Sequence, residues 1–114
     1  MKLFLAFLLD GSGKVDAVMT SIGPPLGLVG DLKFVSTVLS VEAHQLLLLL
    51  TDGITETTTS EDVQFGPDRA LDYVRAHRQD SAHQIAEGIC QAARCFAGGE
   101  HQLDDLTSVV VKVD

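Results

Sequence analysis

The stretch LLLLLTDGITE, from Leu46 to Glu56, constrains the fold more strongly than any other part of the sequence. If residues 46–50 form a strand, their leucines alternate between its two faces, because successive side chains of a strand point in opposite directions. A strand that is apolar on both faces needs a layer of protein on each side. The run ends at Asp52-Gly53. The pattern therefore predicts a buried strand that holds a carboxylate at the rim of its sheet.

Composition limits the class of protein. With 114 residues, the chain is expected to form one domain or part of one, spanning 1–114. An apolar content of 46% excludes a disordered chain. A net charge of −8 argues against nucleic acid as a partner, because phosphate binding depends on clustered Lys and Arg. No apolar segment approaches the roughly 18 residues of a membrane span, so we expect a cytoplasmic protein.

The first half of the sequence predicts strands separated by loops. Apolar runs at 3–9 and 15–20 are joined by DGSGK, whose Asp-Gly and Ser-Gly pairs are typical of a hairpin turn. Residues 21–31 are rich in Gly and Pro and predict an ordered loop. Residues 33–41 alternate and predict a further strand, whereas the polar stretch 51–64 predicts a surface loop.

The second half predicts two helices and a returning strand. Residues 65–78 favour a helix with Pro in its first turn. A second helix within 80–99 begins with Ser81 and Gln84, which have the spacing of a capping box. Helices joined by so few residues form an antiparallel pair. The β-branched run at 106–113 predicts the last strand.

This order of elements predicts an α+β fold. We expect part of a layered β-sandwich, in which the antiparallel helix pair packs on one sheet and a second sheet covers the other face of that sheet.

Asp52 gains a partner if the leucine strand and the last strand are antiparallel neighbours. Asp104 and Asp105 directly precede the last strand, so they would lie beside the end of the leucine strand, roughly 5 Å away across the ladder. Carboxylates held so close favour a hard cation such as Mg²⁺ or Mn²⁺, and Gly53 would let the backbone approach the ion. Spacing alone leaves two other interpretations open. Asp52-Gly53 could form an ordinary turn, and Asp104-Asp105 a solvated cap.

Four short motifs resemble the SpoIIE-like branch of the metal-dependent (PPM-type) protein serine/threonine phosphatases. They are GPPLG at 23–27, LLLLLTDGITE at 46–56, Phe65-Gly66 before the helix pair, and LDDLTSVVV at 103–111. The resemblance covers nearly the whole chain from about residue 21 and corresponds to the C-terminal half of that domain. It implies half of an αββα sandwich.

The resemblance also implies a site and a chemistry. The family hydrolyses phosphoserine and phosphothreonine with two Mn²⁺ or Mg²⁺ ions, which acidify an attacking water. Asp52, with Gly53, matches the ligand in the family's Asp-Gly motif, and Asp104 matches the ligand in its last motif. Asp105 and Glu56 match neighbouring positions and are expected to support the ligands rather than to bind the ions. The implied substrate is a regulatory phosphoprotein, such as an anti-sigma antagonist in a bacterial signalling circuit.

One motif of the family is missing. Its first Asp-Gly, which bridges both ions, has no counterpart here, because Asp10-Gly11 is better explained as the hairpin turn. We therefore expect a C-terminal portion without the N-terminal half, inactive as an isolated chain, and whether it is an enzyme stays open. The alternative is a non-catalytic interaction or dimerisation module of the same fold. Either form would expose strand edges and an apolar face, so we expect self-association.

Overall fold

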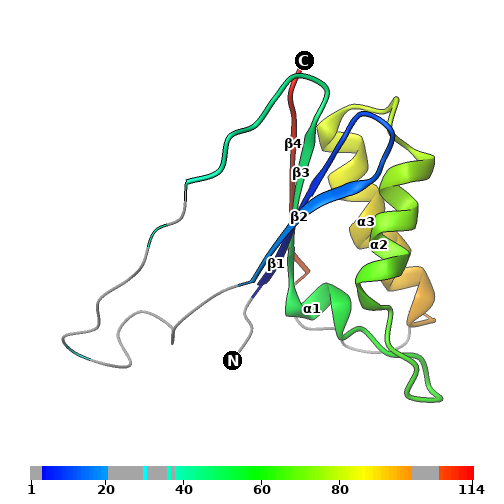
Figure 1. The fold of residues 1–114 in the computed structure, drawn as a ribbon. Coiled ribbons are helices and arrows are strands. Elements are labelled where there is room, and N and C mark those ends of the chain that lie inside the picture. Colours follow the sequence, from blue (N-terminus) through cyan, green and yellow to red (C-terminus); the bar gives the residue numbers. More distant parts are fainter. Residues whose placement is uncertain (1–3, 21–29, 31–35, 37, 99–105) are drawn as a thin grey trace.

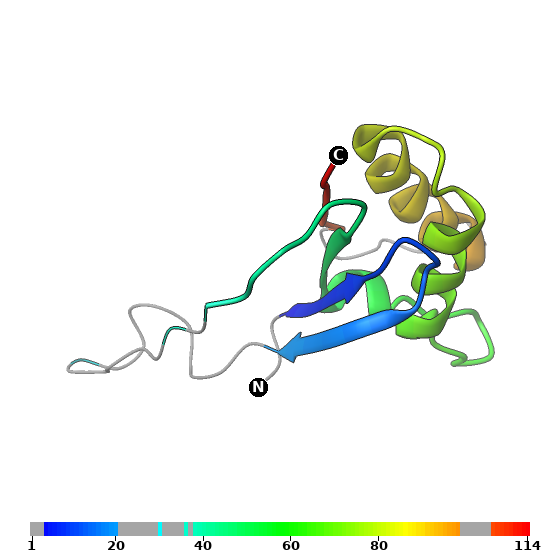
Figure 2. The same ribbon diagram turned by 45° about the horizontal axis from the view of Figure 1, so that its top comes forward.

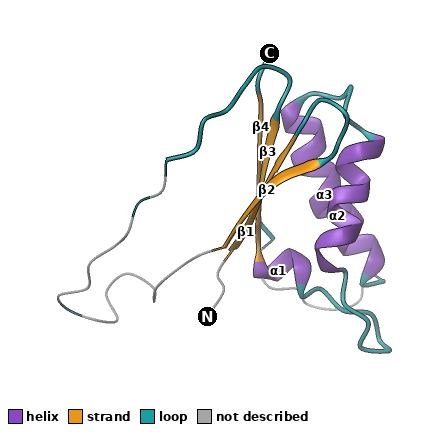
Figure 3. Ribbon diagram, in the orientation of Figure 1, coloured by secondary structure: helices purple, strands orange, loops and turns teal. Residues whose placement is uncertain are grey.

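The structure, a computed structural model, describes residues 4–20, 30, 36, 38–98 and 106–114. Within these residues the chain forms one antiparallel sheet with helices on it (Figure 1, Figure 3). The fold is α+β, as predicted. The elements in chain order are β1 (Phe4–Leu9), β2 (Val15–Thr20), β3 (Leu46–Thr51), α1 (Asp52–Thr55), α2 (Gly66–Ala76), α3 (Ala82–Phe96) and β4 (Ser108–Lys112).

The leucine strand lies inside the sheet, whose strand order is β2-β1-β3-β4. β1 and β2 form the predicted hairpin, and β3 pairs with β1 on one side and with β4 on the other. A bulge in the hairpin falls at Leu8/Leu9. Strands far apart in the sequence are therefore joined through β3, and both of its edges are paired.

The helix pair covers one face of this sheet (Figure 2). Leu46, Leu48 and Leu50 project toward the helices, and Leu48 and Leu50 are 0% and 1% exposed. They pack with apolar side chains from β1 and from the helices. The core residues contributed by β1 and by residues 54–93 are Phe7, Leu9, Ile54, Phe65, Ala70, Leu71, Val74, Ile85, Ile89 and Ala93. The predicted helix pair thus supplies one of the two layers that the leucine strand requires.

The ends of α3 follow the sequence signals. The Ser81 side chain accepts a hydrogen bond from the Gln84 backbone N–H (3.1 Å), and the Ser81 backbone N–H donates to the Gln84 side chain (3.0 Å). This is the predicted capping box, which satisfies backbone donors that the first helical turn leaves free. Gly98 follows the helix with φ +85°, a conformation that glycine adopts without strain.

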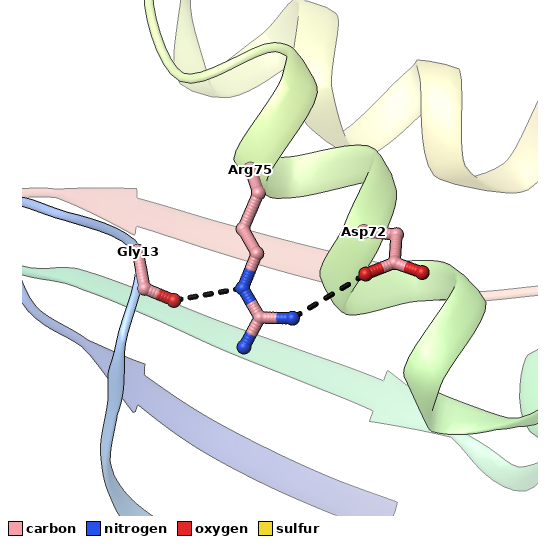
Figure 4. A network of polar contacts seen from close by, with 3 residues as sticks. All are labelled: Gly13, Asp72 and Arg75. Atoms are coloured by element: carbon pink, nitrogen blue, oxygen red, sulfur yellow. Dashed lines mark hydrogen bonds and ion pairs between the residues drawn. The ribbon is translucent and has the colours of Figure 1, made fainter.

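An arginine on α2 ties the hairpin turn to the helix layer (Figure 4). The Arg75 guanidinium donates from Nε to the Gly13 carbonyl oxygen (2.9 Å) and lies 3.4 Å from Asp72 on the same helix. Gly13 has φ +92°, and a Cβ there would lie 3.1 Å from Cγ of Arg75. Glycine at this position therefore permits both the turn and the close approach of Arg75.

Two local predictions were wrong. The strand predicted at 33–41 is not found where the structure describes that segment, because residues 36 and 38–41 have no regular secondary structure; 33–35 and 37 lie outside the described residues. The stretch 51–64 is not simply a surface loop, because it contains the last residue of β3 and then α1, whose Ile54 is fully buried. The second sheet expected over the other face is not among the described elements. Across that face Leu47 and Leu49 are half-buried, and Val109 and Val111 are each 45% exposed.

Candidate metal centre

The end of β3 and the beginning of β4 lie side by side. Leu50 is opposite Ser108 in the antiparallel ladder. One residue further on, the Thr51 backbone N–H donates to the Thr107 carbonyl oxygen (3.1 Å). The Thr51 hydroxyl also donates to that oxygen (3.2 Å) and accepts from the Thr107 N–H (3.3 Å). The two strands on which the candidate site depends, β3 and β4, are therefore neighbours. The hydrogen bonds between Thr51 and Thr107 fix the register of this strand pair.

Asp52 follows this junction as the first residue of α1. It is half-buried, and its carbonyl oxygen accepts from the Glu56 N–H at 2.8 Å. No described residue donates a hydrogen bond to its carboxylate. Ile54, two residues on, is fully buried and anchors the short helix against the core. The carboxylate thus follows a backbone that the core holds in place, and no described donor bonds to its oxygens.

A buried threonine that the sequence analysis missed fixes the backbone after Asp52. Thr57 is 4% exposed, and its hydroxyl donates to the Gly53 carbonyl oxygen at 2.7 Å. Its own carbonyl oxygen accepts from the Phe65 N–H at 2.7 Å. The polar run TETTTS conceals this role, because nothing in the sequence distinguishes Thr57 from the other threonines around it.

The segment after α1 turns back on itself. Thr58 and Gln64 form an antiparallel bridge, and Glu56, Glu61 and Asp62 are all exposed. Arg69 closes this loop, since its Nη1 donates to the carbonyl oxygens of Gln64 (2.9 Å) and Phe65 (3.0 Å). The backbone N–H of Glu56 bonds to Asp52, which places Glu56 one helical turn after it.

Of the predicted ligand side chains, the structure describes that of Asp52. No cluster of three or more Asp, Glu, His or Cys residues able to hold a metal ion occurs among the described residues. The predicted ligand Asp104 and its neighbour Asp105 lie outside the described residues, so their meeting with Asp52 stays a prediction. Mg²⁺ and Mn²⁺ prefer oxygen ligands, and Mg²⁺ is often held by one or two carboxylates plus water. A half-buried carboxylate without a described hydrogen-bond donor fits one such position.

Three further findings concern the described residues. Cys90 and Cys95, both on α3, are free thiols. An open groove of about 760 Å³ runs between α3 and residues 106–108 at the beginning of β4. Among the described helices, none is long and apolar enough to cross a membrane.

Comparison with known proteins supplies the family. The family model described as Stage II sporulation protein E (SpoIIE) matches residues 5–114, which is nearly the whole chain. The chain belongs to the SpoIIE family. The resemblance inferred from the four motifs is therefore confirmed, and SpoIIE membership makes this a phosphatase-related domain of a generally metal-dependent family. Neither the curated proteins nor the solved structures gave a match.

Proposed function

We propose that this chain is the C-terminal portion of a SpoIIE-type phosphatase domain that hydrolyses phosphoserine or phosphothreonine in a regulatory phosphoprotein, such as an anti-sigma antagonist. Asp52 and Asp104 each supply an oxygen ligand to a Mn²⁺ or Mg²⁺ centre of two ions. Asp105 and Glu56 support those ligands. The observation that carries the proposal is the threonine-bonded junction of β3 and β4, which ends at the half-buried carboxylate of Asp52.

The residues of the chain have separate tasks in this mechanism. The ions, when bound, lower the pKa of an attacking water and offset the charge of the phosphoryl group. The Thr51–Thr107 hydrogen bonds hold the two ligand-bearing segments in register. The Thr57 hydroxyl donates to the Gly53 carbonyl and so restrains the backbone directly after Asp52. Preorganisation of this kind avoids a reorganisation cost during the reaction.

The proposal includes an expectation about activity. The family's first Asp-Gly motif, whose carboxylate bridges the two ions, has no match among the four motifs of this chain. We therefore expect weak ion binding and very little turnover from these 114 residues alone. Rapid hydrolysis of a phosphoserine peptide with Mn²⁺, lost in Asp52→Asn, would contradict that expectation of inactivity and would support the assignment of Asp52.

The direct test measures ion binding without activity. Mn²⁺ is paramagnetic, so titrating it into isotope-labelled protein should broaden the amide signals of Thr51, Gly53 and Thr107 first. Asp52→Asn removes one anionic ligand, and we expect at least a tenfold loss of affinity, since losing an interaction of about 1.4 kcal/mol changes a dissociation constant tenfold. Glu61→Gln is the matched control, because Glu61 is an exposed carboxylate in the nearby 58–64 loop.

Two outcomes would contradict the metal site. Broadening centred on the 58–64 loop would show that Mn²⁺ binds exposed acidic residues in general. Equal loss of affinity in Asp52→Asn and Glu61→Gln would lead to the same conclusion.

A second candidate function is a non-catalytic interaction module. The apolar face of the sheet that the described helices leave open, with Val109 and Val111 at 45% exposure, favours it. Self-association through strand edges is compatible with both functions. Site-specific Mn²⁺ broadening that is lost in Asp52→Asn would favour the phosphatase over the module, even where the affinity is weak.

A further inference from the structure

Arg69, in the first turn of α2, binds the loop that leads from Asp52 to this helix. Its Nη1 donates to the carbonyl oxygens of both Gln64 (2.9 Å) and Phe65 (3.0 Å). None of the ion pairs among the described residues includes Arg69. Its guanidinium is therefore used to hold backbone, and a hydrogen bond from a charged donor is stronger than one between neutral groups.

The same guanidinium also lies over the ring of Phe96, the last residue of α3. The Arg69 Cζ is 4.5 Å from the ring centroid, a distance within the range of a cation–π interaction. Phe65 meets this ring edge-on, with the two centroids 5.6 Å apart, and Phe65 is itself buried in the core. Two elements, the loop and α3, therefore fix the position of Arg69.

A series of hydrogen bonds runs from this loop to Asp52. The Phe65 N–H donates to the Thr57 carbonyl oxygen (2.7 Å), and the Thr57 hydroxyl donates to the Gly53 carbonyl oxygen (2.7 Å). Gly53 directly follows Asp52 in the chain. Thr57 is buried, so breaking either bond would leave a polar group without water to replace its partner. A displacement of Phe65 is therefore transmitted to the backbone beside Asp52.

We propose that Arg69 is a positioning residue for Asp52. By holding the backbone of residues 64 and 65, Arg69 keeps Thr57 in place, and Thr57 in turn restrains the backbone directly after Asp52. The Asp52 carboxylate is thereby kept in the orientation that an ion requires. This inference rests on the proposed function in one respect, which is that Asp52 binds Mn²⁺ or Mg²⁺. The link from Arg69 to Asp52 can be measured with or without an ion.

The charge of Arg69 predicts the opposite effect on an ion. A positive charge near an ion site disfavours a second cation, so removal of Arg69 should raise the affinity for Mn²⁺ if only charge matters. Removal of a positioning contact should lower the affinity, because groups that orient metal ligands contribute roughly 10- to 100-fold to metal binding. The direction of the change therefore separates the two roles.

Two substitutions separate the hydrogen bonds of Arg69 from its packing. Methionine at this position keeps an apolar side chain against Phe96 but donates no hydrogen bond, whereas lysine keeps a charged donor without the planar fork. Arg75→Met is the matched control. Arg75 lies on the same helix, carries the same charge and donates to the backbone of a different loop, at the Gly13 carbonyl oxygen (Figure 4).

Hydrogen exchange of the metal-free chain, followed by NMR, tests the link directly. The Glu56 N–H, which donates to the Asp52 carbonyl oxygen (2.8 Å), reports on the backbone of Asp52. In Arg69→Met it should exchange about tenfold faster, because local opening becomes easier, while the Gly13 N–H of the hairpin turn is unchanged. Arg75→Met should show the reverse pattern. Arg69→Lys should be intermediate, with exchange at Glu56 about threefold faster than in the wild type.

Titration with Mn²⁺ measures the consequence for the ion. We expect Arg69→Met to bind Mn²⁺ about fivefold more weakly than the wild type, and Arg69→Lys to recover most of this loss. Arg75→Met should bind as tightly as the wild type. Urea denaturation of each variant verifies that the comparison is made between folded proteins. A merely structural role would lower the stability of both arginine variants without this difference in Mn²⁺ affinity.

Failure of this inference differs from failure of the phosphatase function. Exchange at Glu56 that equals the wild-type rate in every folded Arg69 variant, or equal acceleration at Glu56 and Gly13, would overturn the positioning role. So would Mn²⁺ binding that is unchanged or tighter in Arg69→Met, and in each of these cases Asp52 remains a ligand. Mn²⁺ binding that is equal in the wild type and Asp52→Asn would instead overturn the ion site, whatever the exchange rates show.

Discussion

The two faces of β3 show how differently one strand can be used. On the helix side, Leu48 is fully buried and packs with residues of α2 and α3. On the other side, Leu47 and Leu49 are only half-buried. The side chains are chemically identical, so the difference comes from what lies over each face. The helix side stabilises the fold, whereas the other side keeps part of its apolar surface exposed.

This contrast separates stability from recognition. Burial of apolar surface contributes roughly 25 cal/mol per Å², so the covered face supplies most of the free energy of folding. Apolar surface that remains half-exposed contributes less to the free energy of folding. Its exposed part is left for a binding partner to bury. Substitutions on the helix side should therefore lower the free energy of unfolding strongly, and substitutions on the other side should lower it less.

The largest effect is expected from shortening a covered leucine. Leu48→Ala should lower the free energy of unfolding by about 3 kcal/mol, because it leaves a cavity under the helix pair as well as losing buried surface. Leu49→Ala, the adjacent leucine on the other face, should cost about 1 kcal/mol. Urea denaturation of both variants measures the difference. Equal losses would show that the open face is covered in solution as thoroughly as the helix side.

A smaller effect is expected within the helix layer itself. A Cβ on Gly88 of α3 would overlap the phenol ring of Tyr73 on α2, coming within 2.8 Å of Cε1. Tyr73 cannot move freely, because it stacks on His77 with ring centroids 3.9 Å apart. Gly88→Ala gains about 1 kcal/mol in helix propensity but overpacks the interface, and we expect a net loss of about 1 kcal/mol in stability.

The sign of the Gly88 effect can be reversed. In a Tyr73→Ala background the overlap is gone, so Gly88→Ala should become stabilising by about 1 kcal/mol. Thermal unfolding of the four proteins in this cycle measures the coupling. A loss that persists without Tyr73 would mean that the two helices do not meet at this glycine.

Much of this fold was predictable from local patterns. The hairpin, the leucine strand, both long helices and the capping box at Ser81 were predicted because each depends on residues close together in the sequence. The four-residue helix α1 was missed, since Asp52–Thr55 is too short to show a helical period. The strand predicted at 33–41 failed where it is described, because alternation alone does not supply a neighbouring strand.

The candidate site was predictable only in part. The Asp-Gly pair after an apolar strand indicated Asp52, and the prediction that β3 and β4 are neighbours is confirmed. The role of Thr57 was not visible, because it depends on burial of one threonine among several. Contacts such as Thr51–Thr107 join residues far apart in the sequence, and such pairings depend on the whole fold rather than on a local pattern.

The smallest effect is expected at the hairpin turn, which lies outside both faces. Asp10 accepts hydrogen bonds from the Ser12 hydroxyl (2.7 Å), the Lys14 N–H (3.0 Å) and the Ser12 N–H (2.8 Å). The bond from the Ser12 hydroxyl is the largest cause of a pKa for Asp10 that is lower than the ordinary carboxyl value. The folded state therefore favours the ionised form, and its stabilising contribution is present above the ordinary value and is lost as the pH falls through the lowered pKa.

Asp10→Asn tests this turn by its pH dependence. Asparagine keeps an acceptor oxygen but loses the charge, so the variant should be slightly less stable at pH 7, and the difference should shrink as the pH falls below the ordinary carboxyl range. Urea denaturation at neutral and acid pH measures it, with Glu61→Gln as the exposed control. A difference that grows on acidification would have the wrong sign for a lowered pKa. Because the hydrogen bonds of Asp10 are exposed to solvent, water and salt screen its charge, and so it should contribute less than either face of the sheet.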